Sequence, residues 1–137
     1  MKRTIAIAFL ASTMIMAISS ASAQTKSKAN VPFDFRVGST LMPAGSYEIE
    51  YPRPGVIWFH SQDGRANVLA LAGSTAGATV PPERMVFNRY GNQYFLRETL
   101  TASGEDQMTF APSNLEKSVC AEEASLKSEG RVLIALK

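Results

Sequence analysis

The stretch LMPAGSYEIEY, residues 41–51, decides the fold class of this chain. After a Pro-Ala-Gly corner, large apolar side chains alternate with polar ones: Tyr47, Ile49 and Tyr51 against Ser46, Glu48 and Glu50. A period of two indicates a strand with one buried face and one solvent face. A slip of one residue would expose all three large side chains, so the register is strongly specified. The stretch therefore predicts the start of a strand rather than a binding motif.

The same alternation extends on both sides of this strand. Phe33, Phe35 and Val37 share one face of a preceding segment. Two dipeptides between apolar runs, Asp63-Gly64 and Gly91-Asn92, predict tight hairpins. The run Val56–Phe59 is apolar at every position, which is typical of a strand buried on both faces.

Near the C-terminus the period changes. Ser113 and Glu116 fit a capping box, in which the serine caps a helix and the glutamate reaches back to it. Gly130 is a natural helix stop, and the composition of Arg131–Leu136 favours a final strand over the alternative, a helix. We expect this strand to lie beside Val56–Phe59, with both beneath the helix.

The chain as a whole is thus predicted to be mainly β. Its architecture is a small antiparallel barrel, or a sandwich, of about seven strands with one C-terminal helix followed by a last strand. Residues 31–137 are expected to form a single β domain, a length that suits one hydrophobic core.

The N-terminus has the pattern of an export signal. Lys2 and Arg3 precede an apolar run from Ile5 to Ile18, and Ala21-Ser22-Ala23 offers a cleavage site. We expect residues 1–23 to be a signal peptide and residues 24–30 to be a flexible lead-in. The mature protein is then expected to be soluble, without a membrane span, and either periplasmic or extracellular.

The charge pattern argues against nucleic acid as a partner. The full chain has 14 basic and 12 acidic residues, and loss of Lys2 and Arg3 with the signal leaves 12 of each. The arginines are spread along the chain, whereas a nucleic-acid footprint is a concentrated basic face.

Three segments together resemble a known group of proteins: VPFDFRVG at 31–38, LMPAGSYEI at 41–49 and FNRYGNQYFLRE at 87–98. The chain resembles small exported proteins of unknown function that are abundant in acidobacteria and related soil bacteria. Met42 stands between Leu41 and Pro43, where the group's pattern has leucine and proline adjacent. The resemblance implies export and a β fold; it implies no catalytic residue.

Few residues suggest covalent or metal chemistry. Cys120 and His60 are each the only residue of their kind, so a nucleophilic pair requires that they meet in space. Cys120 is expected to be a buried structural thiol, with a disulfide-linked homodimer as the alternative. No spacing predicts a metal site or a cofactor. Glu48 and Glu50 share a strand face, which is more typical of solvated side chains than of a paired-carboxylate site.

Aromatic side chains are the better candidates for a binding site. Those that could line a barrel mouth and stack on a small apolar or sugar-like ligand are Tyr47, Tyr51, Trp58 and Tyr94, together with Tyr90 and Phe95. The alternative, which we favour, is that these rings form the core.

The sequence therefore predicts a non-enzymatic exported protein of the cell envelope with an interaction or structural role. The alternative is a small-molecule carrier with an apolar cavity inside the barrel. An enzyme is disfavoured, since no acid, base, nucleophile and orienting group come together in the sequence.

Overall fold

The strand predicted after the Pro-Ala-Gly corner is β4 (Gly45–Arg53), as seen in a computed structural model that describes residues 25–75, 83–100, 107–124 and 129–137. Tyr47 and Ile49 are fully buried, and Glu48 and Glu50 lie on the opposite face. The predicted register is confirmed. The expected signal peptide, residues 1–23, lies outside the described residues.

Strand β4 belongs to a four-stranded antiparallel sheet. Its strands, in spatial order, are β1 (Thr25–Val31), β4, β5 (Val56–Ser61) and β6 (Asn67–Leu71). The hairpin predicted at Asp63-Gly64 joins β5 to β6, and Gly64 has a φ of 74°. This left-handed conformation favours glycine.

The other strands form a second sheet. Its main path in spatial order is β11 (Glu129–Ala135), β8 (Arg84–Tyr90), β9 (Gln93–Leu100), β10 (Gln107–Thr109) and β7 (Gly73–Thr75), joined by the hairpin of β2 (Phe35–Val37) and β3 (Thr40–Met42). The predicted Gly91-Asn92 hairpin connects β8 to β9, with a φ of 57° at Gly91. The predicted final strand is confirmed as β11.

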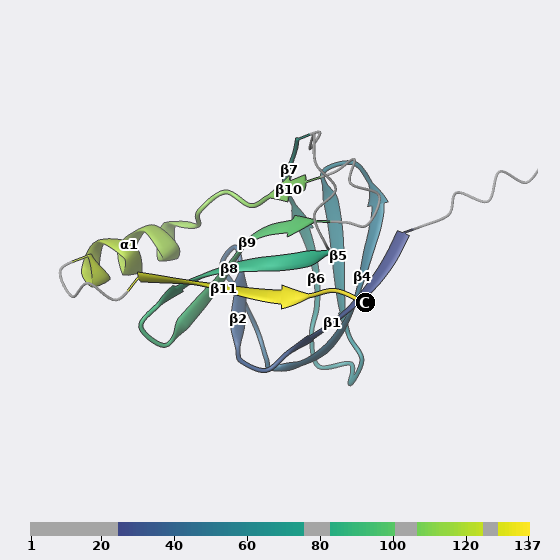
Figure 1. Cartoon of the computed structure of the whole chain (residues 1–137), viewed down its shortest axis with the longest axis horizontal. Coiled ribbons are helices and arrows are strands. Elements are labelled where there is room, and N and C mark those ends of the chain that lie inside the picture. The colour runs from purple at the N-terminus through teal and green to yellow at the C-terminus, as the bar shows by residue number, and fades with distance from the viewer. Residues whose placement is uncertain (1–24, 76–82, 101–106, 125–128) are drawn as a thin grey trace, which may run out of the picture.

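The two sheets meet along two edges and curl around one core (Figure 1). At one edge the backbones of Lys28 and Lys137 exchange hydrogen bonds of 2.8 and 2.9 Å. At the other, the chain passes from β6 into β7 through Ala72. The result is a barrel-like arrangement of eleven strands among the described residues, compared with about seven expected.

Large apolar side chains from both sheets fill the space between them. The bulkiest fully buried ones are Phe35, Met42, Tyr47, Ile49, Ile57, Phe59, Met85, Phe87 and Leu96. At about 25 cal/mol per Å² of apolar area buried, this cluster is the main stabilising element.

The predicted helix is α1 (Asn114–Glu123), which packs on β8 near the β8–β9 turn (Figure 1). Ser113 caps it as predicted, because its hydroxyl accepts the Glu116 N–H at 3.1 Å. The glutamate side chain is instead buried against β8 and β9, so that half of the capping-box prediction is wrong. The helix also ends before Gly130, which lies within β11.

Two expectations about neighbours are wrong. Strand β11 pairs with β8, and β5 lies in the other sheet between β4 and β6, so Val132–Leu136 and Val56–Phe59 are not neighbours. Nor is Val56–Phe59 buried on both faces, because Trp58 is 41% exposed. The physical reason is that the outer face of the four-stranded sheet is not covered by the helix, which packs on β8 instead.

The expected flexible lead-in is also wrong for residues 25–30. They form most of β1, pairing with β4 from Thr25↔Tyr51 to Val31↔Gly45. Ser27, Ala29 and Val31 face inward, and Lys26, Lys28 and Asn30 face outward. The inward side chains of Ser27 and Ala29 are small, so the sequence of this segment shows no hydrophobic alternation. It is nevertheless a strand, because β4 supplies hydrogen-bond partners for its backbone.

Removal of residues 25–30 is therefore expected to lower the melting temperature by at least about 10 °C, since a loss of 1 kcal/mol shifts a domain of this size by about 4 °C or more. The deletion exposes Tyr47 and Ile49 to solvent and leaves β4 without one partner. Differential scanning calorimetry checks this. An unchanged melting temperature would instead support the prediction that these residues are a flexible lead-in.

No helix in the described ranges is long and apolar enough to cross a membrane.

Candidate functional site

The aromatic residues proposed for a barrel mouth lie in different environments. Tyr47 is fully buried, its ring packs edge-on to Phe35 at 5.4 Å, and its hydroxyl donates to the Pro43 carbonyl. Tyr94 stacks on Phe33 with ring centroids 3.9 Å apart. Both rings are thus engaged within the protein.

Tyr51 is half-buried at the edge of the core. Its hydroxyl lies beside Thr99, but no hydrogen bond of good geometry reaches it from the described residues. Trp58 alone among these four points to solvent. Tyr90 and Phe95 form a separate cluster with Val119 of α1. Tyr47, Tyr51 and Tyr94 thus belong to one core cluster, whereas Trp58 lies on the outer face of the four-stranded sheet.

The buried tyrosines make a testable contribution to alkaline stability. Burial raises the pKa of Tyr51 to about 12 and, with nearby acidic charge, the pKa of Tyr47 to about 12, from 10.0. Because each pKa is higher in the folded chain, the stabilisation is complete below pH 10 and is lost as the pH rises towards 12. We expect the melting temperature to fall across this window.

The Tyr51→Phe variant separates this effect from general alkaline unfolding. It removes a hydroxyl without a good hydrogen bond, so its stability at pH 7 should equal or exceed that of the wild type. Its alkaline decline should be shallower in melts recorded at each pH. Identical pH profiles for the two proteins would refute the assignment.

The first candidate surface is the outer face of β5 and β6. Trp58 and Leu69 are directly paired across the strands, and Leu71 pairs with Val56. The leucines are 61% and 78% exposed. We call Trp58, Leu69 and Leu71 the apolar patch. An exposed tryptophan beside two exposed leucines is the kind of surface that marks interaction sites.

The β6 edge adds backbone groups to this patch. Hydrogen bonds flank the β5–β6 ladder at Ser61–Ala66 and Ala72–Gly55, both 2.9 Å. By the antiparallel alternation, Val68 and Ala70 bond to β5, whereas the N–H and C=O groups of Leu69 and Leu71 point away from it. Strand β6 ends the four-stranded sheet. The same residues thus present apolar side chains and backbone groups.

The other half of this face is charged. Lys26 forms ion pairs with Glu48 at 3.0 Å and Glu50 at 2.7 Å. Its hydrogen bond lowers the pKa of Glu48, so this carboxylate is held ionised rather than poised as an acid. Both glutamates and His60 line a polar recess of about 590 Å³. Both carboxylates form ion pairs with Lys26, which agrees with the prediction that they are surface side chains rather than a paired-carboxylate site.

A second candidate lies between α1 and strands β8 and β9. Glu116 is only 4% exposed, and its Oε1 lies 3.5 Å from Asn88 Nδ2. Its Oε2 lies 3.8 Å from Arg97 Nη1. That nitrogen is buried and has no hydrogen-bond partner among the described residues. We call the cavity of about 340 Å³ that these groups line the helix pocket.

The walls of the helix pocket are mostly apolar. Pro112, Ala121 and Ala124 line it, together with the Cys120 side chain. Tyr90 also lines it, and burial raises the pKa of its hydroxyl, with Cys120 and the charge of Glu116 acting in the same direction. The pocket combines a buried charge pair with apolar walls, which is the usual composition of a small-molecule site.

The two residues considered for nucleophilic chemistry are in different places. His60 lies on β5, its ring 4.2 Å from that of Trp58 and its Nδ1 3.3 Å from Asn67. Cys120 lies on α1 and packs against the cluster formed by Tyr90, Phe95 and Val119. The cysteine is half-buried and forms no disulfide within the described chain. The described residues include no group of three or more His, Cys, Asp or Glu side chains suited to a metal ion.

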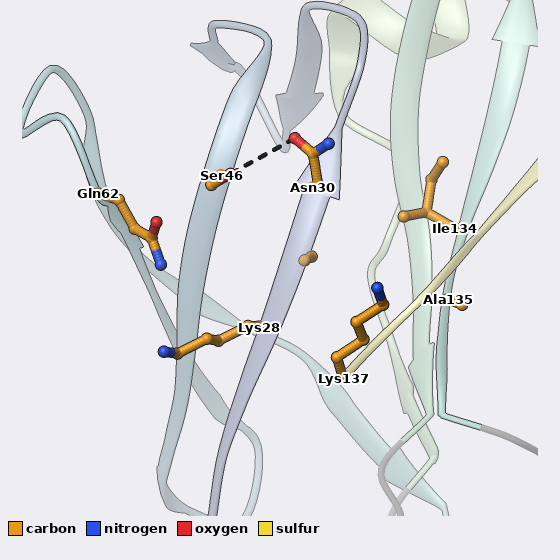
Figure 2. A pocket seen from close by; sticks show the side chains of 8 residues that line it. Lys28, Asn30, Ser46, Gln62, Ile134, Ala135 and Lys137 are labelled. Atoms are coloured by element: carbon orange, nitrogen blue, oxygen red, sulfur yellow. Dashed lines mark hydrogen bonds between the residues drawn. The ribbon is translucent and has the colours of Figure 1, made fainter.

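A third cavity, of about 350 Å³, lies at the seam between β1 and the end of the chain after β11 (Figure 2). Its two lysines, Lys28 and Lys137, extend in different directions. The Ser46 hydroxyl donates a hydrogen bond of 3.5 Å to Asn30 Oδ1. The polar groups do not converge on one point, so we do not treat this seam as the site.

Sequence reasoning missed the helix pocket and the exposed patch for different reasons. The capping-box pattern assigned Glu116 a local role, and no sequence signal shows that this helix residue faces Asn88 and Arg97 on two earlier strands. Because Val56–Phe59 is apolar at every position, the sequence did not show that Trp58 is exposed. The leucines at 69 and 71 alternate with Val68 and Ala70, which is a signal of a strand with two apolar faces.

Comparison with protein-family models, with curated proteins and with solved structures finds no match to this chain.

Proposed function

We propose that this protein is a non-enzymatic, exported interaction protein of the cell envelope that binds an extended segment of a partner protein along β6. The observation that carries the proposal is the coincidence of the apolar patch with the outward backbone groups of Leu69 and Leu71. Export is supported by the N-terminal pattern of residues 1–23 and by the resemblance to small exported proteins.

The chemistry of the β6 edge favours an extended peptide over a small ligand. Backbone groups repeat along a strand every second residue, and only another strand supplies matching donors and acceptors at that spacing. A peptide that pairs there places alternate side chains beside Leu69 and Leu71 on the outer face of the sheet. The partner segment is therefore expected to carry apolar residues at every second position.

The carrier alternative is less well supported. A ligand inside the barrel would need the space that Phe35, Phe59 and Phe87 occupy, and all three rings are fully buried in the core. The helix pocket is the better candidate for small-molecule binding, because it lies outside the core and is not filled by side chains.

A selection from a library of displayed linear peptides tests the proposed function. We expect enriched peptides to share alternating apolar residues and to bind the purified mature chain in isothermal titration calorimetry. The double variant Leu69→Asp/Leu71→Asp should bind at least about tenfold more weakly, which corresponds to a loss of about 1.4 kcal/mol.

The matched control is Leu133→Asp, which alters a leucine that is 58% exposed on β11. This variant should bind the selected peptides like the wild type. Equal weakening by both changes, or the absence of any enriched period-two pattern, would contradict binding along β6.

A further inference from the structure

The helix pocket contains a largely buried charge pair whose two partners do not form a hydrogen bond with each other. Glu116 Oε2 and Arg97 Nη1 are separated by 3.8 Å, which is too long for a hydrogen bond, and their side chains are 5% and 21% exposed. Charged groups removed from water need close partners to offset their lost hydration. The described residues give Glu116 only a long contact with Asn88 and give Arg97 Nη1 no hydrogen bond.

A ligand can complete this pair if it carries opposite charges side by side. An ammonium group matches the Glu116 carboxylate, and a carboxylate group matches the Arg97 guanidinium. A zwitterion offers a partner to both groups, whereas a single anion would add a partner for Arg97 alone and a single cation would add one for Glu116 alone. Lys117 also lines the pocket and adds a second positive charge, and the apolar part of the wall, which includes Pro112, Ala121 and Ala124, suits an apolar side chain.

We propose that the helix pocket binds a free α-amino acid with an apolar side chain. Its ammonium group contacts Glu116, its carboxylate contacts Arg97, and its side chain lies against the apolar wall. The cavity volume of about 340 Å³ falls at the lower end of the range for small-molecule sites, which begins near 300 Å³. This inference is independent of the proposed function, because the pocket and β6 lie on different sheets.

Binding is tested by calorimetry of the purified mature chain with L-leucine and L-phenylalanine. N-acetyl-L-leucine lacks the ammonium charge and L-leucinamide lacks the carboxylate, so each removes one half of the proposed recognition. We expect saturable binding of at least one free amino acid. Both leucine derivatives should bind at least about tenfold more weakly than leucine, because each loses a charge-assisted hydrogen bond.

Two variants place the ligand in the pocket. Glu116→Gln keeps the shape of the side chain and removes its charge, so it should weaken binding of the free amino acid by at least about tenfold. Glu122→Gln removes an exposed carboxylate from the same helix and should leave binding unchanged. If Glu116→Gln fails to fold, titration of the wild-type chain with the two leucine derivatives still tests whether both charges of the ligand are recognised.

Cys120 supplies a second readout because it lines the same pocket. Saturating L-leucine should slow alkylation of its thiol by iodoacetamide, and L-leucinamide at the same concentration should not. Any of three results would overturn the proposal: no binding of either amino acid at millimolar concentration, N-acetyl-L-leucine binding as tightly as leucine, or full binding by a folded Glu116→Gln protein.

Discussion

Replacing Ile49 with aspartate is expected to remove a large part of the free energy of unfolding of this protein. Ile49 is fully buried in the middle of β4, and the core cluster around it consists of apolar and aromatic side chains without a cationic group. Burying an unpaired carboxylate, together with the loss of the isoleucine side chain, costs at least about 4 kcal/mol. The total stability of a small domain is only about 5–15 kcal/mol.

Leu69→Asp is the matched control, because it introduces the same carboxylate on a strand at a side chain that is 61% exposed. Its cost comes from strand propensity and from the lost cross-strand contact with Trp58, and should be no more than about 1 kcal/mol. Urea denaturation of both variants measures the difference. A folded Ile49→Asp protein with near wild-type stability would place Ile49 outside the core and overturn the register of β4.

The second large effect is expected from Arg97→Met. This change leaves the Glu116 carboxylate buried without its cationic neighbour, and breaking a buried pair from one side costs about 3 kcal/mol. Arg65→Met is the control. The Arg65–Asp63 pair is shorter, at 2.9 Å, but its side chains are 72% and 39% exposed. Water screens such a pair, so its loss should cost less than about 1 kcal/mol.

The double variant Arg97→Met/Glu116→Leu tests the origin of this cost. When both charges are removed, most of the lost stability should return, because no uncompensated charge remains in the pocket. Chemical denaturation of the single and double variants gives the coupling free energy. Additive losses in the double variant would show that Arg97 acts through packing alone.

Local periodicity predicted the central strand correctly. Tyr47 and Ile49 are buried where their spacing places them, and both glycine hairpins connect the expected strands. These features depend on residues close together in the chain, where side-chain direction follows from the strand period. The final strand was also predicted, because Arg131–Leu136 follows Gly130, begins with residues that favour strands and is apolar along most of its length.

The errors arise where distant parts of the chain decide the structure. The segment around Ser27 and Ala29 is a strand because β4 offers it a partner, not because of its own hydrophobicity. Trp58 is exposed because α1 packs on β8 rather than on β5. Such pairings depend on topology, which a single sequence encodes only weakly.

The candidate sites show the same division. The sequence singled out aromatic residues, but Tyr47 and Tyr94 serve internal packing. Trp58 lies on the exposed face of β5, and Tyr90 lines the helix pocket. Glu116 was recognised as a helix-start residue, whereas its burial beside Arg97 comes from the packing of α1 on the sheet.

Hydrogen exchange of the β6 amides, measured by NMR with and without a selected peptide, tests strand addition most directly. We predict that exchange at Leu69 and Leu71 slows at least about tenfold when the peptide binds, since their N–H groups become paired. Val68 and Ala70, whose amides already face β5, should change far less. Unchanged exchange at Leu69 and Leu71 under saturating peptide would contradict the account.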